Sequence, residues 1–204
     1  MLNWLKSNHQ ALTAIGAMVV GLAALFIAWD QARVMRAQQH GAVYPILQID
    51  GYYSITGDSV RLGAGVRNAG VGPATIERVD ILRHGEVVED FGPLLAILPQ
   101  STNINWSSMN GRVLAAGDEV RPVDFVWSTD DMDRATEDRL LEEWATWGLR
   151  ACYCSVFDRC FVVDTNDRAG RPEQVRRCER PDTEAFEQLG SAVPGAPPPE
   201  EENP

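Results

Sequence analysis

An uninterrupted apolar segment runs from Ala11 to Trp29 and reads ALTAIGAMVVGLAALFIAW, without a charged residue. A helix rises about 1.5 Å per residue, so a segment of this length spans the roughly 30 Å hydrocarbon core of a bilayer. Inside lipid the backbone has no water to bond, which forces such a segment into a helix. Trp4 also lies near one end, where aromatic rings favour the headgroup region. We expect a transmembrane helix over residues 11–29.

A cleaved signal peptide and a buried helix of a soluble protein are the alternatives to this anchor. The apolar part of a signal peptide usually has about 7–15 residues and ends in a small-x-small cleavage site. Here the segment is longer and ends in Ile27-Ala28-Trp29-Asp30. A buried soluble helix usually carries a polar face. The sequence therefore favours the anchor over both alternatives.

The segments beside the apolar segment do not determine its orientation in the membrane. Residues 1–10 form a short N-terminal stub, expected to be cytoplasmic, and residues 30–41 predict a helical extension that stops at Gly41. Lys6 precedes the apolar segment, while Arg33 and Arg36 follow it. The positive charges are almost balanced, so they do not orient the helix.

Composition limits the classes of partner. Without the anchor and a Pro/Glu-rich tail over residues 191–204, which we expect to be disordered, the 204-residue chain leaves one domain over residues 42–190. The formal net charge is −11. Nucleic acids and anionic lipids require positive protein surface, so no nucleic-acid partner is expected.

The cysteines indicate the compartment. All four, Cys152, Cys154, Cys160 and Cys178, lie in the last third of the chain. An even number in a membrane-tethered domain favours disulfides and an oxidising compartment. Free buried thiols and a zinc site are the alternatives, although structural zinc sites normally use C-x-x-C or Cys/His pairs. We expect no metal.

A hairpin explains how the cysteines pair. Cys152 and Cys154 project from one face of an expected strand, and a turn near Phe157 places Cys154 opposite Cys160. Cys154–Cys160 is therefore the best pair, and Cys152–Cys178 is the second. A redox centre is the functional alternative, but no helix N-terminus or base is near to lower a thiol pKa.

Period-two alternation predicts a mainly β domain. Val60, Leu62, Ala64 and Val66 alternate with polar or small residues, as in a half-buried strand. Other expected strands are Ala74 to Arg83 with a bulge near Glu77 or Arg78, Val87-Val88 after a His84-Gly85 turn, Pro93 to Pro99, Val120 to Trp127, Leu149 to Val156, and Arg159 to Asp164.

The other elements complete the expected fold. A helix over Asp130 to Trp144 should begin after capping hydroxyls, and Met132, Leu140, Leu141 and Trp144 should face inward. Many short strands separated by turns favour a β-sandwich. We expect an N-terminal transmembrane helix, an immunoglobulin-like β-sandwich with one or two short helices, and the tail.

No catalytic or cofactor motif is present in the sequence. The three histidines are far from one another along the chain, and no nucleophile, phosphate-loop or dinucleotide motif occurs. Trp106, Trp127, Trp144 and Trp147 are candidates for a ligand groove, but packing in the core or at its rim is their commoner role. We expect no cofactor and no enzymatic activity.

Small residues in the apolar segment allow self-association. Gly16, Ala17 and Gly21 stand at helical spacing. Small side chains let two membrane helices approach closely. A second copy of this chain is thus a candidate partner beside the bilayer itself.

The segment Val66 to Ile76 contains Asn68, Gly70, Gly72 and Pro73 in an N-x-G-x-G-P-A pattern. This pattern predicts a turn between two strands, because its glycines tolerate positive φ and proline cannot continue a central strand. This pattern resembles that of a class of uncharacterised bacterial single-pass membrane proteins with an immunoglobulin-like β domain. The later Tyr153-Cys154-Ser155-Val156 is similar to their last hairpin. The resemblance implies architecture and no activity.

These observations predict a single-pass protein of a bacterial inner membrane with a periplasmic C-terminal domain. We expect a non-catalytic interaction or assembly module with an unknown protein partner, bound through sheet edges and loops. The alternative is a periplasmic redox accessory or enzyme that uses the cysteine hairpin.

Overall fold

The computed structural model describes residues 8–167, 171–181, 183, 186 and 189. The predicted tail over residues 191–204 lies outside the described residues. Two compact units divide the chain, residues 1–42 and residues 43–204. The chain is mainly β with one long N-terminal apolar helix, which confirms the predicted fold class.

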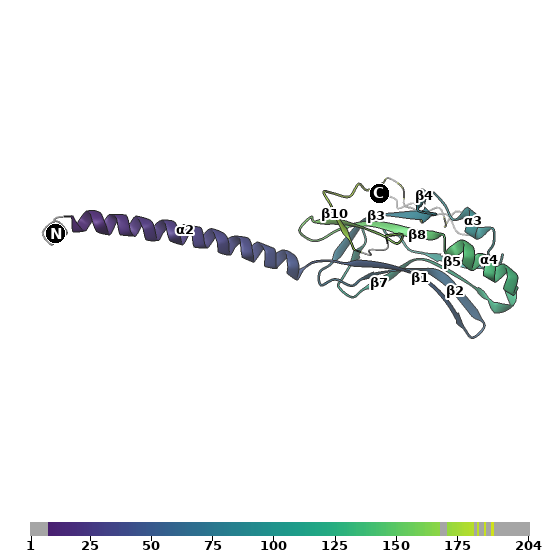
Figure 1. Ribbon diagram of the computed structural model, residues 1–204. Coiled ribbons are helices and arrows are strands. Elements are labelled where there is room, and N and C mark those ends of the chain that lie inside the picture. Colours follow the sequence, from purple (N-terminus) through teal and green to yellow (C-terminus); the bar gives the residue numbers. More distant parts are fainter. Residues whose placement is uncertain (1–7, 168–170, 182, 184–185, 187–188, 190–204) are drawn as a thin grey trace, which may run out of the picture. The chain divides into compact units, whose positions relative to one another are not determined.

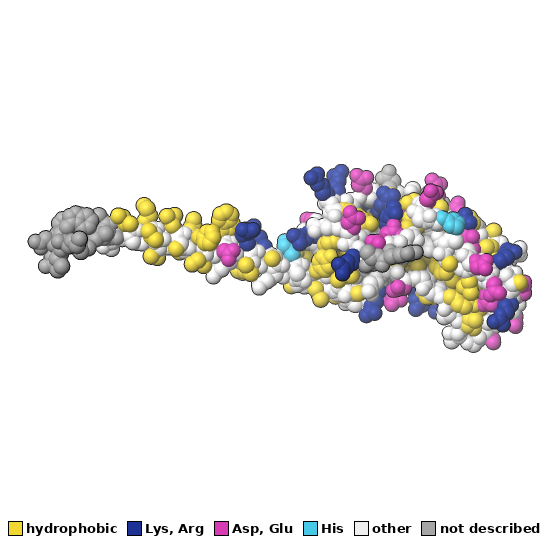
Figure 2. All heavy atoms as spheres, in the orientation of Figure 1, with side chains coloured by type: hydrophobic (Ala, Val, Ile, Leu, Met, Phe, Trp, Pro, Cys, Tyr) yellow, Lys and Arg dark blue, Asp and Glu magenta, His cyan; other side chains and the backbone are white. Residues whose placement is uncertain are grey.

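The first unit is dominated by helix α2, which runs from His9 to Ala42 over 34 residues (Figure 1). It covers the predicted transmembrane segment and the predicted extension as one helix, and it ends one residue beyond Gly41. From Thr13 onward it is long and apolar enough to cross a membrane. Its hydrophobic side chains are exposed along the helix (Figure 2).

The second unit contains two antiparallel sheets that lie one over the other (Figure 1). Sheet A has four strands in the order β1 (Leu47–Thr56), β2 (Ser59–Asn68), β7 (Glu119–Ser128) and β5 (Asn103–Trp106). Sheet B has the order β10 (Glu173–Val175), β9 (Cys160–Asp164), β8 (Trp147–Cys154), β3 (Ala74–Arg83) and β4 (Glu86–Val88), and β6 (Val113–Leu114) also pairs with β3.

The inner faces of the two sheets form one hydrophobic core. The alternating apolar residues of β2 are buried as predicted, and Leu62 and Val66 are fully inaccessible to solvent. Phe125 from β7 and Tyr153 from β8 are among the largest fully buried side chains. Period two therefore places one apolar face of each strand in the space between the sheets.

Two local predictions in β3 and its turn are confirmed. The register between β3 and β8 shifts between Ile76 and Arg78, so Glu77 is the bulged residue. His84 and Gly85 have φ of 53° and 84°. Positive φ at both central residues is the geometry of a two-residue hairpin turn whose twist matches the strands.

The expected strand from Pro93 to Pro99 is wrong. Residues Gly92–Leu95 form the short helix α3 instead, with a proline in its first turn and Leu94 fully buried. Proline has no N–H to contribute to a ladder, and its fixed φ suits the first turn of a helix.

The expected helix from Asp130 to Trp144 is divided. A 3-10 turn, η1 (Thr129–Asp131), comes first, Met132 is then extended with φ −141° and ψ 131°, and α4 covers Arg134–Trp144. Asp133 restarts the helix because its carboxylate accepts a hydrogen bond from the Thr136 N–H at 3.0 Å. The same hydrogen bond is the main reason that the pKa of Asp133 is lowered.

Candidate functional site

A groove follows the open side of the sandwich, between β1 of sheet A and the β8–β9 hairpin of sheet B. One part is a pocket of about 220 Å³ that reaches the aromatic residues Phe91, Trp144 and Trp147, and we call it the tryptophan pocket. The other part is a trough of about 250 Å³ that runs between β1 and the end of β9. Ile49, Asp50 and Thr165 line both parts, so the two lie next to each other.

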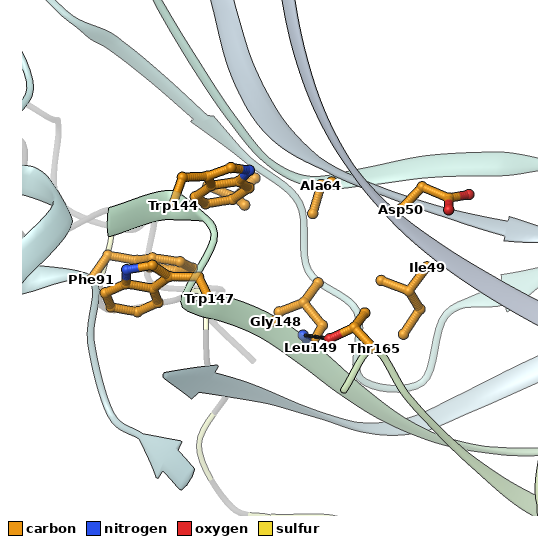
Figure 3. Close-up of a pocket in the computed structure, with 11 residues that line it drawn as sticks. Ile49, Asp50, Ala64, Phe91, Trp144, Trp147, Gly148, Leu149 and Thr165 are labelled. Atoms are coloured by element: carbon orange, nitrogen blue, oxygen red, sulfur yellow. Dashed lines mark hydrogen bonds between the residues drawn. The ribbon is translucent and has the colours of Figure 1, made fainter. Parts of the chain in front are cut away.

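Figure 3 shows how the tryptophan pocket is built, with the aromatic side chains gathered at one end and Ile49 and Thr165 at the other. The rings of Phe91 and Trp147 are stacked, with centroids 5.0 Å apart and planes 21° from parallel. The Leu149 N–H donates to the Thr165 hydroxyl at 3.0 Å, which holds β8 and the end of β9 together at the mouth.

Polar contacts fix the position of Trp147. Its indole N–H donates to Glu143 Oε1 at 2.9 Å, and Arg83 Nε donates to the same oxygen at 2.8 Å. The Arg83 guanidinium also lies 5.8 Å from the centroid of the Trp147 ring. The hydrogen bond from Arg83 is the largest reason that the pKa of Glu143 is lowered. One wall of the pocket is therefore held by a carboxylate, a guanidinium and an indole together.

Trp144 approaches β1 where that strand carries no side chain. A Cβ placed on Gly51 would lie 3.3 Å from the indole nitrogen of Trp144. No acceptor for this indole N–H is found among residues 8–167 or the other described positions. A free donor thus stands at the mouth of the pocket, beside an exposed glycine.

β1 is the outermost strand of sheet A on this side, so its backbone presents an edge to the groove. The Ala69 N–H donates to the Ile46 carbonyl at 2.8 Å, which shows that Ile46 belongs to the hydrogen-bonded pairs with β2. In an antiparallel ladder such hydrogen-bonded pairs alternate with pairs whose backbone N–H and C=O groups point away from the neighbouring strand. The N–H and C=O groups of Ile49, Gly51 and Tyr53 consequently point away from β2.

The beginning of this edge is already occupied. The Leu47 N–H donates to the Tyr153 hydroxyl at 3.3 Å, and burial is the main cause that raises the pKa of Tyr153 to about 12. For Ile49 and Gly51, the described part of the chain offers no hydrogen-bond partner to the outward backbone groups. The unpaired stretch of β1 therefore lies along the tryptophan pocket.

The cysteines lie on the outer face of sheet B, away from this groove. Cys152 and Cys178 are disulfide-bonded with Cα atoms 5.7 Å apart, and Cys154 and Cys160 form the second bonded pair. Cys154 and Cys160 are register partners in the β8–β9 hairpin. The Ser155 N–H donates to the Arg159 carbonyl at 2.8 Å, so the preceding pair is of the non-hydrogen-bonded kind, in which side chains are closest.

The two disulfides also touch each other. The sulfur of Cys154 lies 3.9 Å from that of Cys178, and the sulfurs of Cys154, Cys160 and Cys178 all lie within 4.8 Å of one another. Thiolates are the sulfur ligands of metals, whereas these sulfurs are bonded in pairs. The arrangement is therefore a compact sulfur cluster that ties the segment around Cys178 to the hairpin.

The predicted turn motif is a structural centre. Asn68 is fully buried, and its side chain accepts hydrogen bonds from the N–H groups of Ile46 at 3.3 Å and Gly70 at 3.0 Å. It donates to the carbonyls of Gly72 at 2.8 Å and Leu114 at 3.0 Å. One side chain thus joins β2, the segment before β1, and β6.

The reason given above for the glycines of this motif is wrong. Gly70 and Gly72 are not among the described residues with positive φ. They lie against the backbone of residues 43–46, and a Cβ on either glycine would collide with it. Pro73 follows directly and precedes β3. Glycine is required here by the close approach of two chain segments.

A second polar cluster occupies the outer face of sheet A. Asp124 is 5% exposed and accepts hydrogen bonds from the Tyr52 hydroxyl at 2.7 Å and from Arg61 Nη2 at 2.5 Å. Burial and the hydrogen bond to Asp124 raise the pKa of Tyr52. Tyr52 reaches across Gly63, where a Cβ would meet its hydroxyl oxygen at 2.6 Å. Both carboxylate oxygens of Asp124 accept hydrogen bonds from side chains of β1 and β2, so the cluster stabilises sheet A.

The four candidate tryptophans lie in three different places. Trp127 is 4% exposed and belongs to the core, whereas Trp144 and Trp147 line the tryptophan pocket. Trp106 lines a different, open hollow on sheet A. The sequence did not identify β1 as the other wall, although the alternation of Leu47 and Ile49 with polar residues was a usable signal.

No protein-family model, curated protein or solved structure matches the chain. The functional interpretation therefore depends on the groove, the sulfur cluster and the long apolar helix α2 themselves.

Proposed function

We propose that this chain is a membrane-anchored, non-catalytic interaction module of a bacterial inner membrane, with its β-sandwich in the periplasm. The observation that carries the proposal is the unpaired stretch of β1 beside the tryptophan pocket. A free strand edge with an adjacent pocket is the arrangement by which sheet proteins bind extended partner segments. Small-molecule pockets usually have about 300–1,000 Å³, so the pocket of about 220 Å³ suits one side chain better than a cofactor.

The sulfur cluster and α2 support the compartment. Disulfides persist in oxidising compartments, and the two bonded pairs here include all four cysteines of the chain. An apolar helix long enough to span a bilayer precedes the domain. A single-pass protein with its C-terminal domain outside the cytoplasm accounts for both features.

Crosslinking in intact cells tests the interaction role. A photoreactive amino acid is placed one position at a time at exposed apolar sites of the domain, namely Ile55, Val87, Val113 and Val156. We expect a discrete adduct, identified by mass spectrometry, from the β1 site and none from the others. Absence of adducts from every position in membranes that contain the full-length chain would contradict the interaction role.

A reporter fused after residue 204 tests the compartment. An enzyme that is active only after export should be active in this fusion, and a reporter that works only in the cytoplasm should be silent. The reverse pattern would place the domain on the cytoplasmic side and remove the support for stable disulfides.

A redox role is a second candidate because the two disulfides are in contact. If a dithiol reductant opened Cys154–Cys160, the Cys154 thiolate would lie beside the sulfur of Cys178, which permits thiol–disulfide exchange. Alanine at Cys154 or Cys160 separates the two roles. A structural bond predicts that stability and function are lost together, whereas a redox site predicts loss of function in a fold of unchanged stability.

A further inference from the structure

We propose that the free edge of β1 binds an extended segment of another protein as an added antiparallel strand. In this segment a basic residue lies opposite Asp50. The residue that precedes it in the partner's sequence is apolar, lies opposite Gly51 and enters the tryptophan pocket. This inference rests on the proposed interaction role and adds the chemistry of the partner to it.

The backbone of β1 provides the recognition surface. Ile49, Gly51 and Tyr53 direct their N–H and C=O groups away from β2, as the alternation set by the Ile46–Ala69 hydrogen bond requires. A strand that pairs with these groups completes a ladder that sheet A leaves open on this side. Main-chain hydrogen bonds of this kind provide affinity that does not depend on sequence.

The tryptophan pocket provides selectivity for one apolar side chain. Directly opposed residues of an antiparallel pair project to the same face. A residue opposite Gly51 therefore projects toward the inside of the sandwich, where Trp144, Trp147 and Leu149 line the pocket. Gly51 has no side chain to fill that space. The indole N–H of Trp144, which has no acceptor among the described residues, stands beside it.

Charge determines the neighbouring residue of the partner. Asp50 is exposed, and its carboxylate points away from the aromatic end of the pocket (Figure 3). Among the described residues, the trough beyond it is lined by Asp167 and by Asp164, whose carboxylate pairs with Arg150 at 2.8 Å. A lysine or arginine opposite Asp50 would form a cross-strand pair of opposite charges. A second copy of the chain, itself at net charge −11, fits this acidic edge poorly.

The test uses the full-length chain in micelles of a neutral detergent and a short fluorescent peptide. The peptide alternates threonine and lysine around one central leucine, and its binding is measured by fluorescence anisotropy with empty micelles as the blank. Two comparison peptides carry glutamate in place of lysine, or alanine in place of leucine. We expect the lysine–leucine peptide to bind, and each replacement to weaken binding by about tenfold.

Three variants locate the bound peptide. Gly51→Pro removes an outward N–H and no bond to β2, so it should weaken binding by about tenfold while the fold persists. Asp50→Lys should weaken binding of the lysine peptide and strengthen binding of the glutamate peptide, each by about fivefold. Asp58→Lys makes the same charge change in the β1–β2 turn and should alter either affinity by less than about twofold.

Failure of the peptide to bind would overturn the inference, and so would either of two other results. One is equal binding by the parent chain and by Asp50→Lys, which remains decisive even if Gly51→Pro fails to fold. The other is a dimer in micelles that Gly51→Pro converts to a monomer, because a second copy would then occupy the edge. If the peptide does not bind but the cellular crosslinks arise from Val113 or Val156, the interaction role stands and only the β1 site is wrong.

Discussion

Asn68 shows how much of this fold depends on single buried polar side chains. Its amide joins backbone groups from three separate segments, and it has no exposed surface. A buried polar group that loses its partner keeps the full cost of its removal from water. The residue therefore matters for stability well beyond the turn in which it stands.

Replacement of Asn68 by alanine should destabilise the domain by about 3 kcal/mol, because the N–H groups of Ile46 and Gly70 and the carbonyl of Leu114 lose their partner. Urea unfolding of the full chain in micelles, followed by tryptophan fluorescence, measures the change. Arg67→Ala, at the exposed neighbouring position, is the control and should cost less than about 0.5 kcal/mol. A loss no larger than the control would contradict this role.

Glu143 makes stability depend on pH. The pKa of Glu143 is lowered in the folded state. The ionised carboxylate therefore stabilises the fold fully above its unfolded-state pKa of about 4.3, and this stabilisation is lost as the pH falls through its folded-state pKa. Glu143→Gln should cost about 1 kcal/mol at pH 7, and the gap to the parent chain should close in acid. Glu142→Gln, at the exposed preceding residue, is the control, and its difference in stability from the parent chain should not depend on pH in this way.

At the scale of elements, local patterns predicted much of the sandwich and failed where tertiary contacts decide. Alternation located β2 and β3, and His84-Gly85 correctly located the hairpin turn between β3 and β4. The break at Met132 depends on Asp133 starting a second helical segment, which a run of polar residues does not reveal. The groove joins β1 to residues about 100 positions later, and no window along the sequence contains both walls.

The two disulfides should differ in their effect on stability. The bond between Cys152 and Cys178 closes a separation of 26 residues, whereas Cys154–Cys160 closes one of 6. Chain entropy predicts a loss of about 3.5 kcal/mol when the first pair is changed to serine and about 2 kcal/mol for the second. Paired substitutions leave no odd thiol, and urea unfolding compares them. A larger loss for the second pair would show that hairpin packing outweighs loop closure.

At the scale of the whole molecule, α2 is about 51 Å long by its 34 residues, which exceeds the roughly 30 Å hydrocarbon core of a bilayer. Gly16, Ala17 and Gly21 lie within its apolar part, and nothing described lies within 4 Å of a Cβ added to either glycine. That small-residue face remains a predicted site for a second copy.

The redox state of the cysteines in cells reports the location of the domain. If the domain is periplasmic, a membrane-permeant thiol reagent should label none of the four cysteines in intact cells, and all of them after reduction and unfolding. Mass spectrometry of the digested protein measures the labelling. Label at any cysteine before reduction would contradict the compartment, and release of the chain by alkaline wash would contradict the anchor.

The bond from Cys152 to Cys178 has a consequence for a damaged molecule. A protease that cuts after Arg171 separates two fragments along the backbone, yet the sulfur link still holds them as one covalent body. The part that contains Cys178 is released only when an electron donor opens that link. Clipped molecules would therefore persist outside the cell's reducing interior and fall apart on entering it.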